Sequence, residues 1–205
     1  MAKNTVITIA RQCGSGGHEI GVRLGELLGV PVYDNELLTL AAKKHGLPED
    51  YLRRADEKAT GSLLYMLAMG ATHHTHLHTG VEMSVNDKLF IAQTEVIKEI
   101  AERESAVFIG RCADHVLRNH GHCISIFIHA DFEARVNRIC EKRACSRKEA
   151  ESFVTKTDKS RINYYSFYTG GKWGKSDRYH LTIDSSLLGI EGTARLLADM
   201  VKGLA

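Results

Sequence analysis

The sequence predicts an α/β fold in which a parallel sheet is sandwiched between two layers of helices. Short β-branched apolar runs alternate along the chain with stretches whose apolar residues recur at helical spacing. The first run leads into a glycine-rich turn, and no Pro-, Ser- or charge-rich linker interrupts the 205 residues. Hydrophobic residues make up 43% and charged residues 25%, as in ordinary globular domains. We therefore expect residues 1–205 to form a single domain.

The elements of the first part of the chain follow in order. Residues 6–10, a β-branched run, form the first expected strand, and the glycine turn leads into a helix over residues 20–28. Gly29 ends this helix, because glycine readily adopts the left-handed conformation of a helix C-terminus. Residues 30–33 form a second short strand, and Asp34 is placed to cap the helix that follows.

The later elements show the same alternation. Apolar runs predict three more buried strands, at residues 106–109, 123–128 and 179–183. Helical periodicity separates or follows these strands, at residues 89–100, 132–140 and 190–201.

Two segments do not fit this pattern. Residues 60–84 are rich in glycine and histidine, and residues 164–178 are aromatic and basic. Long loops inside a compact domain tend to be functional, so we expect both segments to line or cover the site. The run His73–His78 could bind a transition metal, but no cysteine or carboxylate lies among its histidines. We therefore expect no metal site there.

Charge and composition exclude several classes of function. Lysine and arginine number 27 against 25 aspartates and glutamates, a net charge of +2 that is too even for a general nucleic-acid binder. The longest apolar stretch, residues 63–71, is far short of the roughly 20 residues that span a bilayer. The first residues show neither the apolar run nor the cleavage site of a secretory signal, so we expect none, and five cysteines without a Cys-x-x-Cys motif indicate reduced thiols. We expect a cytoplasmic protein that binds neither nucleic acid nor a membrane.

The strongest local feature is the turn between the first strand and the first helix, which runs from Arg11 to Ile20. Its glycines let several N–H groups point into one concavity, and the helix that follows adds its positive end, so the turn predicts a phosphate cradle. The residues that could form this cradle are Gly14, Ser15, Gly16, Gly17, His18 and Glu19. A tight turn without a ligand is the alternative, because the sequence is not Gly-x-x-x-x-Gly-Lys-[Ser/Thr].

Longer segments resemble one known family. The opening, ITIARQCGSGGHEIGVRLGELLGVPVYDNELL, is similar to that of the cytidylate kinase-like family. Three later segments match this family in order and spacing: VFIGRCADHVL, SIFIHADFEARVNRI and DKSRINYYSFYTGGKWG…YHLTIDSS. The resemblance implies a P-loop NTPase fold, a three-layer α/β/α sandwich. It also implies a helical substrate-binding insertion at about residues 40–85 and a lid at about residues 150–178.

The resemblance also implies roles for individual residues. Gly14–Gly17 match the family's phosphate loop, and Asp34 falls where an aspartate helps to hold the cytidine nucleotide. Arg111 falls where an arginine contacts the monophosphate. Asp158 and Arg161 match an Asp-x-x-Arg pattern of the lid, in which we expect Asp158 to bind substrate and the arginine to reach the transferring phosphates. Arginines suit this reaction, because phosphoryl transfer depends on positioning and on neutralising negative charge.

The chain departs from the family pattern in the phosphate loop. The place of the loop lysine falls on Gly17 or His18, and that of the magnesium-binding serine or threonine falls on His18 or Glu19. The strand-end Asp-Gly-Arg-Asp of cytidylate kinases reads Ile-Gly-Arg-Cys here. Asp114 is near in sequence, but on a helix expected to start at Arg111 it is shifted by about half a turn. Other cations must then supply the charge, so we expect Arg11 and His18, at the two ends of the loop, and Arg161 to be catalytic.

Two further features are open to more than one interpretation. The basic residues between Arg135 and Lys148 alternate with glutamates, which is typical of a solvated helical face. Trp173 lies in a segment rich in glycine and lysine, where it could move with a lid or pack permanently in the core.

The expected function is ATP-dependent phosphoryl transfer to a nucleoside monophosphate, most simply CMP or dCMP to the diphosphate. ATP is the expected phosphoryl donor, Mg²⁺ the expected cofactor, and nucleotide substrates the expected partners. A kinase for another small molecule on the same scaffold is one alternative. A non-catalytic nucleotide-binding or regulatory protein is another, and it would explain the missing lysine and aspartates together.

Overall fold

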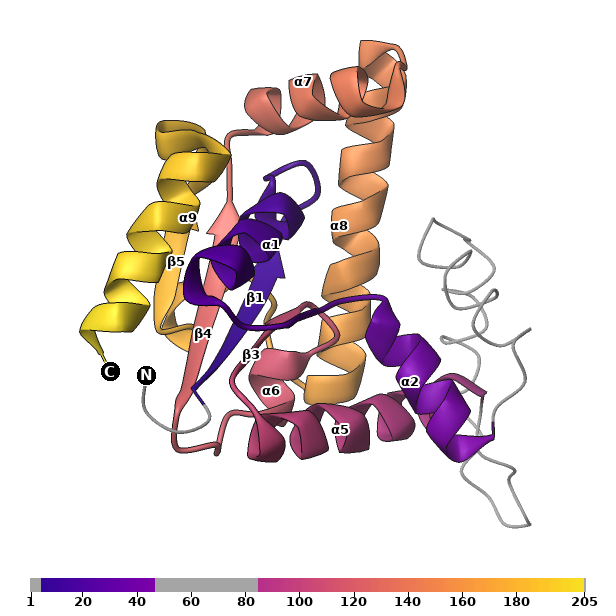
Figure 1. Cartoon of the computed structure of the whole chain (residues 1–205). Helices are drawn as coiled ribbons and strands as arrows, with labels where there is room; N and C mark the ends of the chain where they lie inside the picture. The colour runs from indigo at the N-terminus through magenta and orange to yellow at the C-terminus, as the bar shows by residue number, and fades with distance from the viewer. Residues whose placement is uncertain (1–4, 47–84, 205) are drawn as a thin grey trace.

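The computed structural model describes residues 5–46 and 85–204, and these residues contain a five-stranded sheet with the order β2-β3-β1-β4-β5 (Figure 1). The strands are β1 (Val6–Arg11), β2 (Val32–Tyr33), β3 (Ala106–Ile109), β4 (Cys123–His129) and β5 (Leu181–Asp184). Every pair of neighbours is parallel, so the carboxyl ends of all five strands lie at one edge of the sheet. Ligands of open α/β sheets bind outside that edge.

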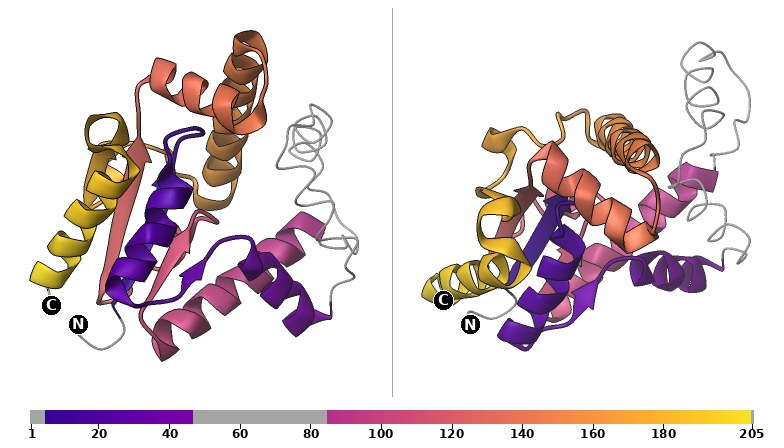
Figure 2. Two further views of the ribbon diagram at one scale, coloured as in Figure 1. Left: turned by 45° about the horizontal axis from the view of Figure 1, so that its top comes forward. Right: turned by 90° about the horizontal axis from the view of Figure 1, so that it is seen from above.

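Helices cover both faces of the sheet, with α1 and α9 on one side and α5, α6 and α8 on the other (Figure 2). The helical elements of the described chain are α1 (Gly17–Leu28), α2 (Glu36–His45), α5 (Val85–Arg103), α6 (Ala113–Val116), α7 (Phe132–Arg143), α8 (Arg147–Thr169), the 3₁₀ turn η2 (Ser176–Arg178) and α9 (Ser185–Gly203). The predicted three-layer α/β/α sandwich with a parallel sheet is confirmed. No helix in these two stretches of the chain is long and apolar enough to cross a membrane.

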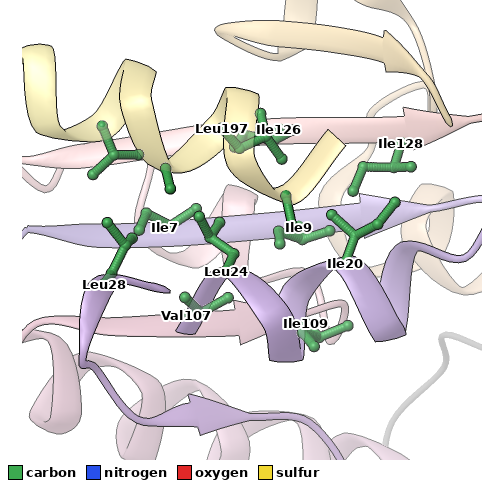
Figure 3. Close-up of a cluster of buried hydrophobic side chains, with 13 residues drawn as sticks. Ile7, Ile9, Ile20, Leu24, Leu28, Val107, Ile109, Ile126, Ile128 and Leu197 are labelled. Carbon is green, nitrogen blue, oxygen red and sulfur yellow. The ribbon is translucent and has the colours of Figure 1, made fainter. Parts of the chain in front are cut away.

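Strand alternation explains the two cores. Ile7 and Ile9 of β1 point to one face, where they pack against Ile20 and Leu24 of α1 and Leu197 of α9 (Figure 3). Burying each such side chain stabilises the fold by about 1.5–3 kcal/mol. This core fixes α1 against the sheet, and with it the loop that precedes α1.

The opposite face carries a second core. Val6 of β1 and Phe108 of β3 pack there against Leu37 of α2, Ile97 of α5 and Leu117 just after α6. The sheet thereby holds α2 and α6 close to the carboxyl ends of β2 and β3.

Three local predictions need correction. Asn35, not Asp34, takes the N-cap position of α2, because the Asp34 carboxylate faces Arg11 and His18 instead. The helix expected from Arg111 begins at Ala113, since the residues before it adopt left-handed backbone angles.

The third correction concerns the segment expected to be a loop from residue 164 to residue 178. Residues up to Thr169 continue α8, which begins with a reciprocal capping box between Ser146 and Glu149 and ends at Gly170. The other unusual segment, residues 60–84 with the run His73–His78, lies outside the described residues, as does most of the expected insertion at 40–85.

Candidate phosphate-transfer site

The loop between β1 and α1 has the form of an anion cradle. Gly14 and Gly16 adopt left-handed angles, with φ of 76° and 77°, and the Ser15 hydroxyl turns inward to accept the N–H of Gly17 at 3.3 Å. Within the described chain, the backbone N–H groups of Gly14, Gly16 and His18 have no hydrogen-bond partner. Because they lie at the positive end of the α1 dipole, they are available to an anion.

The side chain of Arg11 runs across this loop. A Cβ atom at Gly17 would collide with the Cβ of Arg11 and lie 3.0 Å from its Cγ. A Cβ atom at Gly110 would collide with Nη1 of Arg11 and lie 3.0 Å from its Cζ. Two glycines therefore make room for Arg11, whose guanidinium ends beside the turn that follows β3.

This path explains the missing lysine. With Gly16 aligned on the second glycine of Gly-x-x-x-x-Gly-Lys-[Ser/Thr], Gly17 takes the place of the lysine and Arg11 that of the first glycine. The cation and the glycine have exchanged positions, and the arginine stem fills the space above Gly17.

Charges of both signs surround Arg11, with positive charge in excess. Arg11 Nη2 and His18 Nε2 each lie 3.5 Å from a different carboxylate oxygen of Asp34, and Arg161 Nη1 donates to the Arg11 carbonyl at 2.8 Å. Burial lowers the pKa of Arg11 to about 9, together with the nearby Arg161 and Arg111, while Asp34 opposes this shift. Arg11 still carries its charge at neutral pH, and an added anion would be stabilised here.

The turn after β3 is the second strained feature of the site. Gly110, Arg111 and Cys112 all have positive φ, at 75°, 56° and 56°. Left-handed angles cost an L-residue about 1–2 kcal/mol each. Such strain persists where surrounding contacts enforce it, often at functional sites. The turn directs Arg111 towards the end of β2, where its Nη2 donates to Asn35 Oδ1 at 2.7 Å.

A carboxylate on α8, that of Asp158, and two arginines on α7, Arg135 and Arg138, bind the backbone of the phosphate loop. Asp158 accepts the Cys13 N–H at 2.7 Å through Oδ1 and the Arg135 guanidinium at 2.6 Å through Oδ2. Arg135 also donates to the Cys13 carbonyl at 3.3 Å, and Arg138 donates to the Gly14 carbonyl at 2.8 Å. The substrate-binding role of Asp158 stays a prediction, because its carboxylate contacts the loop in this structure.

Arg135 and Arg138 are site residues that the sequence analysis missed. The prediction of a solvated helical face between residues 135 and 148 holds for Arg147, which pairs with glutamates on α7 and α8. It is wrong for Arg135, which is only 8% exposed, and for Arg138. Their i, i+3 spacing on a helix that starts next to the functional edge of the sheet was the available signal.

Most aromatic residues of the expected lid segment pack against other parts of the protein, although Phe167 is 42% exposed. Tyr168 stacks on Phe90 of α5 with ring centroids 4.0 Å apart, and Tyr165 is 4% exposed. Trp173 lies edge-on against Phe127 of β4 at 5.1 Å. These contacts favour fixed packing of Trp173 over a mobile position.

Oxygen ligands for Mg²⁺ are few around the loop. Lys142 binds the Glu19 carboxylate at 2.5 Å, and Asp158 is occupied as described. Asp34, which lies beside His18 at the start of α1, has the hard carboxylate oxygens that Mg²⁺ prefers. The described residues contain no group of three or more metal-ligating side chains, so a Mg²⁺ ion here would depend on substrate phosphates as well.

Fold and site together define a class: a phosphate-loop protein of the small-molecule kinase type, with arginines from several elements gathered around the loop. Within that class the chain belongs to the cytidylate kinase-like family, whose model matches residues 6–187. The predicted family is thereby confirmed. A search of curated protein sequences finds no match.

Solved structures agree with this fold. An uncharacterised protein from Eubacterium ventriosum ATCC 27560 is 27% identical, with a TM-score of 0.70, and the match covers 96% of this chain and 98% of that one. A gluconokinase from Sinorhizobium meliloti 1021 is 14% identical, with a TM-score of 0.56 and coverage of 100% and 97%. A shikimate kinase from Bacteroides thetaiotaomicron is 12% identical, with a TM-score of 0.53 and coverage of 97% and 98%.

Proposed function

We propose that the protein transfers the terminal phosphoryl group of ATP to an anionic small molecule, most simply CMP or dCMP, to give the diphosphate. One observation carries the proposal: the Arg11 side chain runs from Gly17 in the phosphate loop, where its Cβ and Cγ lie, to the turn that bears Arg111, where its guanidinium lies against Gly110. A cation on this side chain would contact both the phosphates of ATP and the acceptor molecule.

The position of each residue in the site indicates its role in the transfer. The amides between Gly14 and Glu19 hold the donor phosphates at the positive end of α1. Arg111 holds the acceptor phosphate, and Arg11 and Arg161 neutralise the charge that spreads over the transferring group. An acceptor oxygen forms a bond to the terminal phosphorus as the bond to the bridging oxygen breaks, and ADP leaves with that electron pair. The acceptor phosphate is already an oxyanion, so the reaction needs no general base.

Mg²⁺ supplies charge neutralisation on the donor phosphates when it is bound. We assign Asp34 to hold it, directly or through water, in addition to the contact with the cytidine nucleotide that the family resemblance implies for this residue. His18 lies beside the same carboxylate, at the exposed end of the loop, and adds a donor for the phosphates.

A kinase for a different small molecule remains the second candidate. Its specific support is the fold shared with a gluconokinase and a shikimate kinase. The loop and the arginines would act in the same way on another acceptor.

A panel of acceptors tests the proposal. Nucleoside monophosphates, gluconate and shikimate are each incubated with ATP and Mg²⁺, and the phosphorylated product is identified by mass. We expect CDP or dCDP, and an Arg111→Ala variant with a raised KM for the acceptor. Arg118→Ala, which removes an exposed arginine nearby, is the matched control and should behave like the parent protein. Turnover with a non-nucleotide acceptor alone selects the second candidate, and ATP binding without any transfer contradicts both.

A further inference from the structure

Asp114 is a buried carboxylate that the proposed mechanism does not use. It lies in the first turn of α6, directly after the left-handed turn that bears Arg111, and is 9% exposed. The Tyr165 hydroxyl of α8 donates to its Oδ2 at 2.6 Å, and Tyr165 is itself 4% exposed. A buried carboxylate with such a partner requires an explanation, because burial of a charge is costly unless it is hydrogen-bonded.

The first consequence of this contact is local. Cys112, the N-cap residue of α6, accepts the His115 N–H at 3.0 Å, and the Ala113 N–H is donated to Gly110 at 3.0 Å. The left-handed turn and the start of α6 are therefore one hydrogen-bonded unit. The Tyr165 hydroxyl attaches that unit to α8, so the strained angles of the turn cannot relax without breaking a buried hydrogen bond.

The second consequence reaches the phosphate loop. Asp158, Arg161 and Tyr165 follow one another at i, i+3 and i+7 on α8, a spacing that places them on one face of a helix. Asp158 contacts the phosphate loop at Cys13, and Arg161 contacts it at Arg11. Tyr165 contacts Asp114, which directly follows the turn that bears Arg111. One rigid helix thus joins the two halves of the site.

We propose that Asp114 and Tyr165 form a positioning pair that holds the turn bearing Arg111 at a fixed place relative to the phosphate loop. Neither residue touches substrate. The pair acts through Arg111, so it governs how tightly the acceptor binds and leaves the donor half of the site unchanged. This inference rests on the proposed function for the identity of the Arg111 ligand, but the fixed geometry of the turn does not depend on it.

Tyr165→Phe is the test variant, because it keeps the buried ring and removes only the hydroxyl. Thr169→Val is the matched control. It removes another hydroxyl from α8, which donates to the Tyr165 carbonyl at 2.7 Å and accepts the Gly171 N–H at 3.0 Å, and it does not touch Asp114. Melting temperatures of both variants establish that each is folded.

Hydrogen–deuterium exchange of the segment 109–116 is measured first, since it needs no substrate. We expect faster exchange in Tyr165→Phe than in the parent protein and in Thr169→Val. With an acceptor from the panel, Tyr165→Phe should raise the KM for that acceptor about 10-fold, the scale of one lost hydrogen bond to a charged group, and leave the KM for ATP unchanged.

The outcomes separate this inference from the proposed function. If no acceptor is phosphorylated, the proposed function fails, and the exchange measurement still decides whether the pair holds the turn. Unchanged exchange in Tyr165→Phe overturns the inference. Equal effects of Tyr165→Phe and Thr169→Val on exchange, or on both KM values, overturn it as well, because they would show only a general loosening of α8.

Discussion

Arg11 and Gly17 are coupled by their shared space, and an exchange of the two residues tests that coupling. A lysine at position 17 would bring its Cβ into collision with the Cβ of Arg11. Gly17→Lys alone should therefore disturb the loop and lower activity. Arg11→Gly alone removes one preorganised cation, which costs about 2–4 kcal/mol of transition-state stabilisation, or about 30- to 1,000-fold in kcat/KM.

The double variant Arg11→Gly/Gly17→Lys restores the usual spacing of glycine and lysine, with the clash removed and the cation returned. We expect it to recover kcat/KM to within about tenfold of the parent protein. If the two substitutions acted independently, the losses in kcat/KM of the two single variants would instead multiply. ADP formation with the acceptor found in the panel is the assay, and melting temperatures report folding. Gly121→Lys is the control, because the structure leaves open space around that glycine. Parental activity and stability of Gly17→Lys, or a double variant no better than Arg11→Gly, would refute the reasoning.

Three further predictions concern Asp114, Trp173 and the run His73–His78. Burial raises the pKa of Asp114, so its ionisation destabilises the folded state as the pH rises above the ordinary aspartate pKa. The melting temperature of Asp114→Asn should therefore exceed that of the parent protein by an amount that grows from about pH 4 to pH 7. Trp173 packs on Phe127, so its emission should stay constant when ATP and acceptor bind together, and a clear shift would instead indicate a moving lid. Dialysis against a chelator, followed by return of Mg²⁺, should leave melting temperature and activity unchanged; a zinc-dependent rise in stability would show that the His73–His78 run binds metal.

The fold was predictable because its signals are local and repeated. Each strand is an apolar run, the helices α1, α5, α7 and α9 each have a periodic apolar stripe, and the glycine turn marks the junction of β1 and α1 at the phosphate loop. The helix α8 was not predicted, because aromatic residues on a helix that packs against several partners do not form a simple stripe.

The site was predictable only where a role depends on backbone chemistry or on a motif. Gly14 and Gly16 adopt the left-handed angles that a tight loop requires. Arg135 and Arg138 looked like surface charge, since their i, i+3 spacing places them on one face of α7 but does not show that this face turns to the loop. The Asp114–Tyr165 contact joins residues 51 positions apart, and only the packing of α8 on α6 brings them together.

A structure with a bisubstrate analogue, adenosine and cytidine joined through five phosphates, tests the central claim most directly. We predict that its donor phosphates lie within hydrogen-bond distance of the amides between Gly14 and Glu19. Arg11 should contact the phosphate at the transfer position, and Arg111 the acceptor phosphate next to cytidine. An analogue whose phosphates bind elsewhere and leave the loop empty would contradict the account.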